Sequence, residues 1–205
     1  MQQEVKAEFL KAMMEEVRDL MENRNFSIMK RNQVPKGSTI LPCVRQMKRK
    51  HHIITRKIKR WKARLNVDGS RMTKVVHYDK VYAPVSSCTF ILLLLTMIVL
   101  HYWTTKQIDY VQEFPLAPAD KDLYLKVLAG FEIEGGKKGD YALKLHENIY
   151  GQKQAGRVWY MYLTKKLFGE LGLEISQVDE CVFYRGKKEY ILYTDAYILA
   201  GPDLE

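Results

Sequence analysis

The chain has 205 residues, of which 47% are hydrophobic, 11% aromatic and 28% charged. This length and composition favour one domain or a pair of tightly joined subdomains, and they exclude a largely disordered chain. The three cysteines, Cys43, Cys88 and Cys181, are far apart, so we expect neither a disulfide framework nor a zinc site. The first residues lack the pattern of a signal peptide. We therefore expect an intracellular protein, cytoplasmic or nuclear, with no membrane partner.

The net charge of +9 is concentrated in one segment. Between Lys48 and Lys74 there are eleven Lys or Arg residues and one acid, Asp68, which gives this segment a local charge of +10. The rest of the chain is therefore close to neutral. A concentrated basic segment indicates a polyanionic partner, with nucleic acid favoured over an anionic membrane surface. A solvated cationic face is the alternative.

The first third of the chain predicts one helix followed by short strands. Apolar residues recur at three- and four-residue spacing over residues 5–20, which is typical of an amphipathic helix. Residues 27–29 predict a short strand, and Pro35, Lys36 and Gly37 predict a turn. Residues 39–47 predict a longer strand. Within the basic segment, Ile53 with Ile54 and then residues 58–67 predict two more strands.

The strongly apolar stretch 90–100 is interrupted only by Thr96. A transmembrane helix needs about 20 apolar residues, so this stretch is too short to span a membrane. Because it is hydrophobic on every side, we expect a helix that is buried in a core.

The remainder alternates between strands and one further helix. We expect an amphipathic helix over residues 157–171 and a polar turn over residues 134–140. The strand predictions cover residues 108–114 (a strand or its exit), 123–127, 141–145, 181–184, 190–194 and 197–199, with 181–194 forming a hairpin. Strands in succession with interspersed helices favour an α+β fold over a regular βαβ series.

Two aspartates in strand-like surroundings are candidate metal ligands. Asp109 lies in the stretch Gln-Ile-Asp-Tyr-Val, and Asp195 lies in Tyr-Thr-Asp-Ala-Tyr. Two carboxylates from the ends of neighbouring strands could hold Mg²⁺, with water and phosphate oxygens completing the shell. By spacing alone, an aspartate near a strand end is more often a turn residue or a surface charge.

A series of short blocks in a fixed order carries a family resemblance. Read along the chain, the blocks begin at Lys62 (KARL), Tyr82 (YAPV), Gln107 (QIDxVxxF), Asp122 (DLYL), Gly130 (GFE), Ile149 (IYGxKQAGRxW), Asp179 (DECVF), Tyr193 (YTD) and Leu199 (LAG). This succession resembles the reverse transcriptases of copia-type retrotransposons, and it covers most of the chain from about Pro35 to Pro202.

The resemblance implies an α+β fold with the fingers and palm of a reverse transcriptase, in which an antiparallel palm sheet packs on helices. Residues 1–34 would form an N-terminal helix and lead-in, and residues 35–205 the fingers and palm. The implied reaction adds deoxynucleotides to a primer on an RNA or DNA template, with Mg²⁺ or Mn²⁺ as cofactor. Other parts of a retrotransposon polyprotein are further expected partners.

The resemblance also implies roles for individual residues. Asp109 matches the first catalytic aspartate, and Asp195 matches the first aspartate of the Y-x-D-D turn, so both would be catalytic metal ligands. Phe114 matches the aromatic residue that excludes a ribose 2′-hydroxyl. The nucleotide-binding residues would be Lys62, Arg64, Phe114 and Gln154, and the template–primer residues would be Gly151, Gly156 and Arg157.

Three departures from the family pattern predict an impaired copy. Ala196 replaces the second aspartate of the turn, which removes a negative charge opposite two divalent cations. Glu113 stands where a small residue is expected beside Phe114, and its carboxylate should repel a polyphosphate. Because the sequence ends at Glu205, we also expect the palm to be incomplete and the thumb and RNase H regions to be missing. A non-catalytic nucleic-acid-binding remnant and a decayed reading frame therefore remain alternatives.

Overall fold

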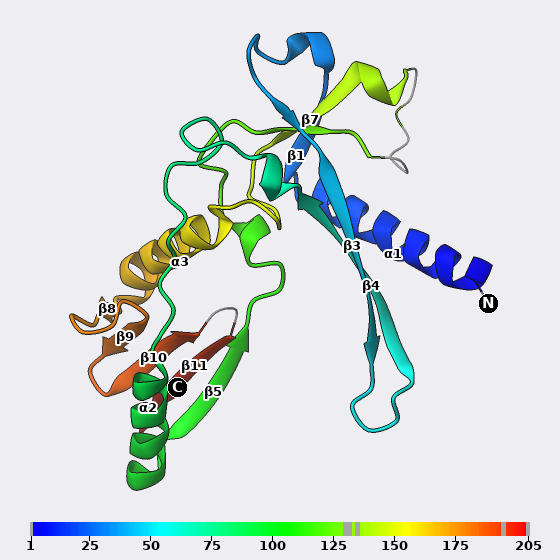
Figure 1. Ribbon diagram of the computed structural model, residues 1–205. Helices are drawn as coiled ribbons and strands as arrows, with labels where there is room; N and C mark the ends of the chain where they lie inside the picture. The colour runs from blue at the N-terminus through cyan, green and yellow to red at the C-terminus, as the bar shows by residue number, and fades with distance from the viewer. Residues whose placement is uncertain (1, 129–132, 134–135, 194–195, 204–205) are drawn as a thin grey trace. The chain divides into compact units, whose positions relative to one another are not determined.

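The structure is a computed structural model that describes residues 2–128, 133, 136–193 and 196–203 (Figure 1). The chain forms two compact units. The first comprises Met1–Val81 and Phe114–Val158, and the second comprises Tyr82–Glu113 and Trp159–Glu205. Each unit is described separately below.

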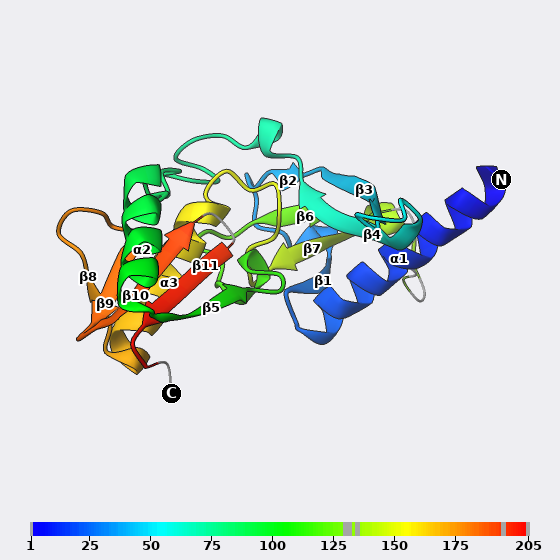
Figure 2. The ribbon, with the colours of Figure 1, turned by 90° about the horizontal axis from the view of Figure 1, so that it is seen from below.

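The first unit contains a four-stranded sheet and a long two-stranded ribbon (Figures 1 and 2). Its elements are α1 (Gln2–Glu22), β1 (Phe26–Lys30), η1 (Arg31–Gln33), β2 (Ile40–Leu41), β3 (Cys43–His51), β4 (Ile58–Val67), η2 (Gly69–Arg71), η3 (Phe114–Leu116), β6 (Tyr124–Lys126), η4 (Lys138–Asp140) and β7 (Tyr141–Leu145). The sheet has the order β1-β7-β6-β2, in which only the β2–β6 pairing is parallel. A core that includes Leu41, Leu65, Leu125, Leu143 and Ile149 joins this sheet to the base of the ribbon.

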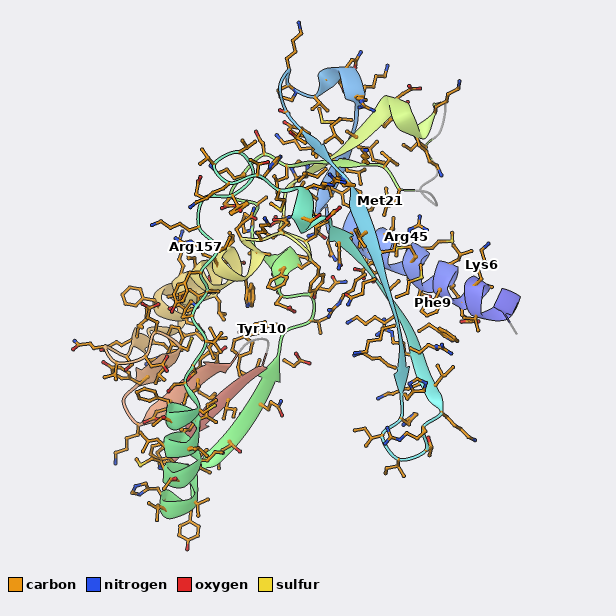
Figure 3. The ribbon with its side chains drawn as sticks, in the orientation of Figure 1. Lys6, Phe9, Met21, Arg45, Tyr110 and Arg157 are labelled. Carbon is orange, nitrogen blue, oxygen red and sulfur yellow. The ribbon has the colours of Figure 1, made fainter. Side chains whose placement is uncertain are left out.

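Helix α1 confirms the periodicity seen in the sequence. Its apolar side packs on the ribbon, where Ala12 and Met13 contact Ala63 of β4. The rings of Phe9 and Trp61 meet edge to face with their centroids 4.7 Å apart, and Figure 3 shows Phe9 on the side of the helix toward the ribbon. The amphipathic pattern thus arises because one side of α1 covers one face of β4.

Of two strand predictions in this unit, one is confirmed except for a break and the other is wrong. The predicted strand over residues 39–47 is divided at Pro42, since proline has no backbone N–H for the ladder, and its second part continues to His51. Ile53 and Ile54 lie in the turn between β3 and β4 and form no strand. The turn is closed by a hydrogen bond from the amide of His52 to the carbonyl of Lys57, after an irregularity in the ladder at His51. The local turn geometry therefore outweighs the β propensity of the two isoleucines.

The second unit is built around a five-stranded antiparallel sheet in the order β5-β11-β10-β9-β8. Its strands are β5 (Thr104–Asp109), β8 (Glu174–Ile175), β9 (Val182–Arg185), β10 (Lys188–Tyr193) and β11 (Ala196–Gly201), and its helices are α2 (Cys88–His101) and the larger part of α3 (Ala155–Leu171). The predicted hairpin is confirmed, because β9 and β10 pair around Gly186. Helix α3 is confirmed as well and begins two residues before the predicted start.

The two helices cover opposite faces of this sheet. Ile191 and Ile198 pack in a cluster with Leu94 of α2. The neighbouring residues along the strands point the other way, and the hydroxyl of Tyr197 accepts a 2.8 Å hydrogen bond from the indole N–H of Trp159 in α3. This alternation along the strands is what a sheet covered on both faces requires.

Helix α2 is confirmed as a helix, but the expectation that it is buried on every side is wrong. Its start is capped by Ser87, whose hydroxyl accepts from the amide of Phe90, and only its face toward the sheet is covered. Leu94 is the fully buried member of the helix. Four of its apolar side chains are between 54% and 73% exposed, namely Leu92, Leu93, Val99 and Leu100. Uniform hydrophobicity therefore did not mean uniform burial.

Of the two alternatives for residues 108–114, the exit of a strand is confirmed, because only the first two of these residues belong to β5. Strand β5 ends at Asp109, and the next residues form a turn in which Gln112 has a left-handed φ of 55°. The 3-10 helix η3 then begins at Phe114. The expected mixture of helices with largely antiparallel sheets is confirmed. Within the described part of the chain, no helix is both long enough and apolar enough to cross a membrane.

Candidate functional site

One face of the β3–β4 ribbon is strongly cationic. Strand pairing places Gln46 opposite Arg64, Lys48 opposite Lys62 and Lys50 opposite Arg60. Because side chains at alternate positions share a face, five cations project from this side. The other face carries Ala63 and Trp61, which α1 covers. The sequence from Cys43 to Val67 contains no acidic residue, so no carboxylate within the ribbon balances this charge.

The like charges on this face influence one another. Burial lowers the pKa of Lys62, and the nearby charges of Arg64 and Lys50 lower it further. Glu16 of α1 opposes this shift, and its carboxylate accepts a hydrogen bond from the amide of Leu65. Like charges directly opposite each other destabilise a ladder, so a bound polyanion would relieve repulsion that the free ribbon carries.

Two of the predicted nucleotide-binding residues meet on a third side chain, Tyr150. The guanidinium carbon of Arg64 lies 4.2 Å from the centroid of the Tyr150 ring. The ring of Phe114 lies 5.2 Å from the same ring, centroid to centroid. Tyr150 is 9% exposed, so both contacts are shielded from water. The structure thus brings Arg64 and Phe114 together through a residue that had been assigned no role from the sequence.

The loop that carries Tyr150 is docked on the end of β4. The amide of Val67 donates to the carbonyl of Tyr150 over 2.8 Å. The next residue, Gly151, has a φ of +86°, and a Cβ atom there would lie 2.2 Å from the carbonyl oxygen of Val67. Both the left-handed backbone and the lack of space require glycine. Gly151 therefore allows the close approach of the loop to the ribbon.

Two buried asparagines hold the segment of Phe114 against this loop. The side-chain amide of Asn25 donates to the carbonyl of Pro115 over 2.9 Å. The amide of Asn148 donates to the carbonyls of Ala117 and Pro118 over 3.0 and 2.9 Å. Both asparagines are at most 1% exposed. Buried polar groups need such partners, so these bonds fix the backbone around Phe114.

Gln154 is fully buried, and its amide donates to the carbonyl of His77 and to the carboxylate of Asp120, each over 3.2 Å. It therefore ties the segment after β4 to the start of α3. Gly156 and Arg157 follow in the first turn of α3, both half-buried. The roles of these three residues toward nucleic acid stay predictions.

The second unit holds Asp109. Its side chain is exposed at the end of β5, and the ladder pairs it with Ala196, the first residue of β11. The other predicted ligand, Asp195, lies outside the described residues. Glu113 is half-buried in the turn that follows β5. The ring of Tyr110, which is labelled in Figure 3, anchors the residue next to Asp109. It packs on Trp159 and Tyr197, with ring centroids 5.3 and 4.8 Å away.

Asp109 fits a hard divalent cation in ligand type, since Mg²⁺ prefers carboxylate oxygens and retains several waters. An alanine side chain offers no ligand atom, so Ala196 cannot add to that set. Among the described residues, His, Cys, Asp and Glu side chains form no group of three that could hold a metal ion.

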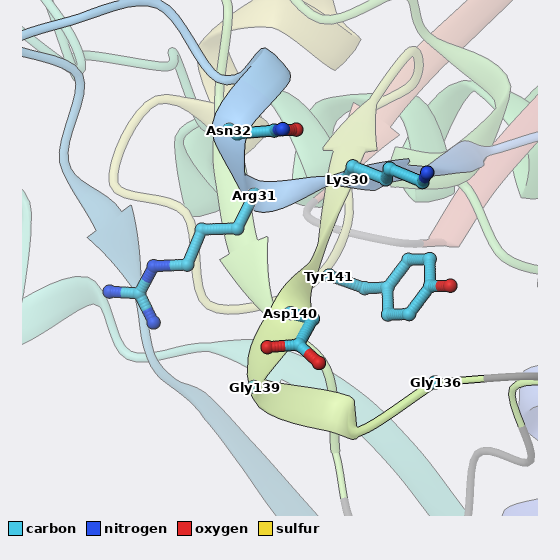
Figure 4. A pocket seen from close by; sticks show the side chains of 7 residues that line it. All are labelled: Lys30, Arg31, Asn32, Gly136, Gly139, Asp140 and Tyr141. Atoms are coloured by element: carbon cyan, nitrogen blue, oxygen red, sulfur yellow. The ribbon is translucent and has the colours of Figure 1, made fainter.

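A separate hollow lies in the first unit, with a cavity volume of about 620 Å³ (Figure 4). It is lined by Lys30 and Arg31 together with Asp140 and Tyr141. None of the residues that the sequence assigned to a site lines it. Its mixed charges indicate no particular ligand.

Comparison with known proteins identifies the family of this arrangement. The family model described as reverse transcriptase (RNA-dependent DNA polymerase) matches residues 26–205. The chain belongs to the reverse transcriptase family. The resemblance to copia-type retrotransposons is confirmed by its relatives. The chain is 30% identical over 203 residues to a retrovirus-related Pol polyprotein from transposon TNT 1-94 of Nicotiana tabacum, and the match covers 97% of the chain.

Two further relatives agree with this assignment. The Pol polyprotein from transposon RE1 of Arabidopsis thaliana is 30% identical over 150 residues, or 71% of this chain. A truncated transposon Ty1-A Gag-Pol polyprotein of Saccharomyces cerevisiae is 27% identical over 104 residues, or 51% of this chain. The reverse transcriptase chain spans only 15%, 10% and 8% of the lengths of these three proteins.

Proposed function

We propose that this chain provides the fingers and palm of a retrotransposon RNA-directed DNA polymerase. The β3–β4 ribbon and its sheet would be the fingers, and the five-stranded sheet of the second unit would be the palm. Residues 35–205 would form this fingers-and-palm domain, with residues 1–34 as a lead-in whose helix braces the ribbon. The proposal is supported by the family match and by an antiparallel sheet with helices on both faces.

On the nucleotide side, Lys62 and Arg64 would bind the triphosphate of the incoming dNTP, and Phe114 would exclude a ribose 2′-hydroxyl. Tyr150 would hold Arg64 and Phe114 in place, because its ring contacts both side chains. Gln154 would belong to the same nucleotide-binding set, and Gly151, Gly156 and Arg157 would position the template–primer duplex at the start of α3.

On the metal side, Asp109 and Asp195 would ligate Mg²⁺ or Mn²⁺. Divalent ions at this place would neutralise charge on the reacting phosphates. Ala196 leaves this set one carboxylate short of the family pattern, and Glu113 adds a negative charge in the turn that leads to Phe114. We therefore propose that metal affinity and nucleotide binding are both weakened and that this copy is inactive.

The observation that carries the proposal is the register that sets Ala196 opposite Asp109 at the strand ends. We expect no measurable primer extension on an RNA or DNA template with either Mg²⁺ or Mn²⁺. Incorporation above that of the Asp109→Ala variant would overturn the proposed inactivity. Restored extension by Ala196→Asp would identify Ala196 as the main lesion, and continued inactivity would exclude it as the sole one.

A second function, nucleic-acid binding without catalysis, is favoured by the cationic face of the ribbon, which does not depend on Ala196. Each phosphate contact contributes about −0.9 to the slope of log K against log salt for duplex DNA. We expect the Lys48→Gln/Arg60→Gln variant to lower that slope by about 2 in fluorescence polarisation with an RNA–DNA hybrid. The Lys11→Gln/Lys165→Gln variant, with the same loss of charge, should leave the slope unchanged. Salt-insensitive binding by the unmodified chain would contradict this function.

A further inference from the structure

The turn at the end of the cationic ribbon presents two strongly exposed isoleucines. Ile53 is 89% exposed and Ile54 is 93% exposed. Nearly complete exposure of two adjacent branched apolar side chains is unfavourable in water. Polar residues are the usual choice in an exposed turn, so the presence of two isoleucines here needs an explanation.

The turn has a defined conformation that holds the isoleucines in place. The amide of His52 donates to the carbonyl of Lys57 over 2.9 Å, and the amide of Arg56 donates to the carbonyl of His52 over 3.0 Å. The ribbon also continues for about 13 Å beyond the pair of Met47 with the buried Ala63, at about 3.3 Å per residue. The two side chains are thus carried at the end of a projecting arm.

The charged residues of the arm itself are all basic. Between Lys48 and Arg60 there are seven Lys or Arg residues and no acid. An apolar tip between rows of cations matches nucleic acid, whose stacked bases are apolar and whose phosphates line the outside. A two-stranded antiparallel ribbon is also narrow enough to enter a nucleic-acid groove.

We propose that Ile53 and Ile54 form a wedge that enters the base stack where a duplex meets a single strand. Apolar side chains, including isoleucine, unstack base steps in this way, while neighbouring cations hold the phosphates. The wedge would open the first base pair ahead of the ribbon when the bound strand is base-paired. This inference rests on the proposed binding of nucleic acid by the ribbon.

The size of the apolar tip argues against other occupants. A standard protein interface buries about 800 Å² on each partner, which two isoleucines cannot supply. A membrane-surface anchor requires an apolar face formed by many residues, and the tip has two apolar side chains within a basic turn. One base step, in contrast, needs only one or two inserted side chains.

The test uses an RNA–DNA hybrid with a single-stranded RNA overhang and 2-aminopurine in the DNA strand at the first base pair. Polarisation of a fluorescein at the far end reports binding, and 2-aminopurine fluorescence reports unstacking. The variants are Ile53→Ser/Ile54→Ser and, as a matched control on another exposed apolar pair, Val75→Ser/Val76→Ser. Circular dichroism checks that both variants are folded.

At saturating protein we expect about a twofold or larger rise in 2-aminopurine fluorescence with the unmodified chain and the control. The isoleucine variant should bind within about threefold of the same affinity, because the cations remain, but should give no rise. An equal rise with the isoleucine variant would refute the wedge. A loss of more than about tenfold in its affinity would also refute it, since the isoleucines would then serve general binding.

Three further outcomes are distinguishable. Binding without any rise by the unmodified chain overturns the wedge and leaves the binding function intact. Failure of the unmodified chain to bind overturns both. If the isoleucine variant instead loses cosedimentation with vesicles of phosphatidylserine and phosphatidylcholine, and no unstacking is seen with the unmodified chain, the tip is a lipid contact and the wedge is refuted.

Discussion

The contact of Arg64 with the ring of Tyr150 makes a quantitative prediction about stability. Tyr150→Leu removes the ring but keeps an apolar side chain, and Arg64→Met removes the charge but keeps the length of the side chain. If the ring holds the guanidinium, the two substitutions together should cost less unfolding free energy than the sum of their separate costs.

The magnitude follows from the geometry. A guanidinium 4.2 Å from the centroid of a ring that is 9% exposed should gain about 1–2 kcal/mol. The contact between the rings of Tyr150 and Phe114, at 5.2 Å, should add about 0.5–1.5 kcal/mol. We therefore expect Tyr150→Leu to cost about 2–3 kcal/mol, of which about 1–2 kcal/mol is coupled to Arg64.

The assay is urea unfolding of chains labelled with 5-fluorotryptophan and followed by ¹⁹F NMR. Of the three tryptophans, Trp61 lies in the first unit and the others in the second, so its signal reports the unit that contains Tyr150. As a control, Arg60→Met replaces the arginine four residues before Arg64 on the same face, roughly 13 Å away along the strand, and should show no coupling. Additivity of Arg64→Met and Tyr150→Leu within about 0.5 kcal/mol would refute the reasoning.

Three further predictions concern the same unit. Burial raises the pKa of Glu16 in the fold, so its contribution to stability is complete below its unfolded value of 4.5 and is lost as pH rises through the folded pKa. Glu16→Gln should therefore raise the melting temperature at pH 7 but not at pH 4, as measured by thermal denaturation. Gly151→Ala should lower the unfolding free energy by about 3 kcal/mol or more, whereas Gly139→Ala, where a Cβ atom meets nothing within 4 Å, should be nearly neutral in urea titrations. Because the pKa of Lys62 is lowered, its side chain should lose its charge as pH rises, at pH values below the usual lysine pKa of about 10.4. The affinity for an RNA–DNA hybrid should therefore begin to decrease at these pH values, and polarisation against pH should show that Lys62→Arg removes this early decrease.

The secondary structure was predictable wherever one covered face sets the residue pattern. Helix α1 alternates apolar and polar sides because only one side meets β4, and strand β7 was predicted with its observed bounds, Tyr141–Leu145. Helix α2 shows the limit of such patterns. Its apolar residues surround the helix, so the sequence cannot tell which side the sheet covers. The prediction of a strand at Ile53 and Ile54 was wrong because these residues, which favour strands, lie in a turn.

The candidate site was predictable only in part, because its contacts join distant segments. The ordered blocks pointed to Arg64 and Phe114 separately, but no local pattern shows that both rest on Tyr150. The bond from Asn25 to Pro115 spans 90 residues and belongs to no block. Asn148 stands directly before the block that contains Tyr150, and this position was the only signal in the sequence that could have drawn attention to it.

The residues proposed for catalysis and those proposed for nucleic-acid binding lie in different units of the chain. Asp109 and Ala196 belong to the second unit, whereas the cationic ribbon, Tyr150 and Phe114 belong to the first. The described contacts of Tyr150 with Arg64 and Phe114 lie within the first unit. Binding of nucleic acid by the ribbon should therefore survive a loss of catalysis. A chain that fails to extend a primer, yet binds an RNA–DNA hybrid with a salt dependence set by its ribbon, would show that the two properties have separated.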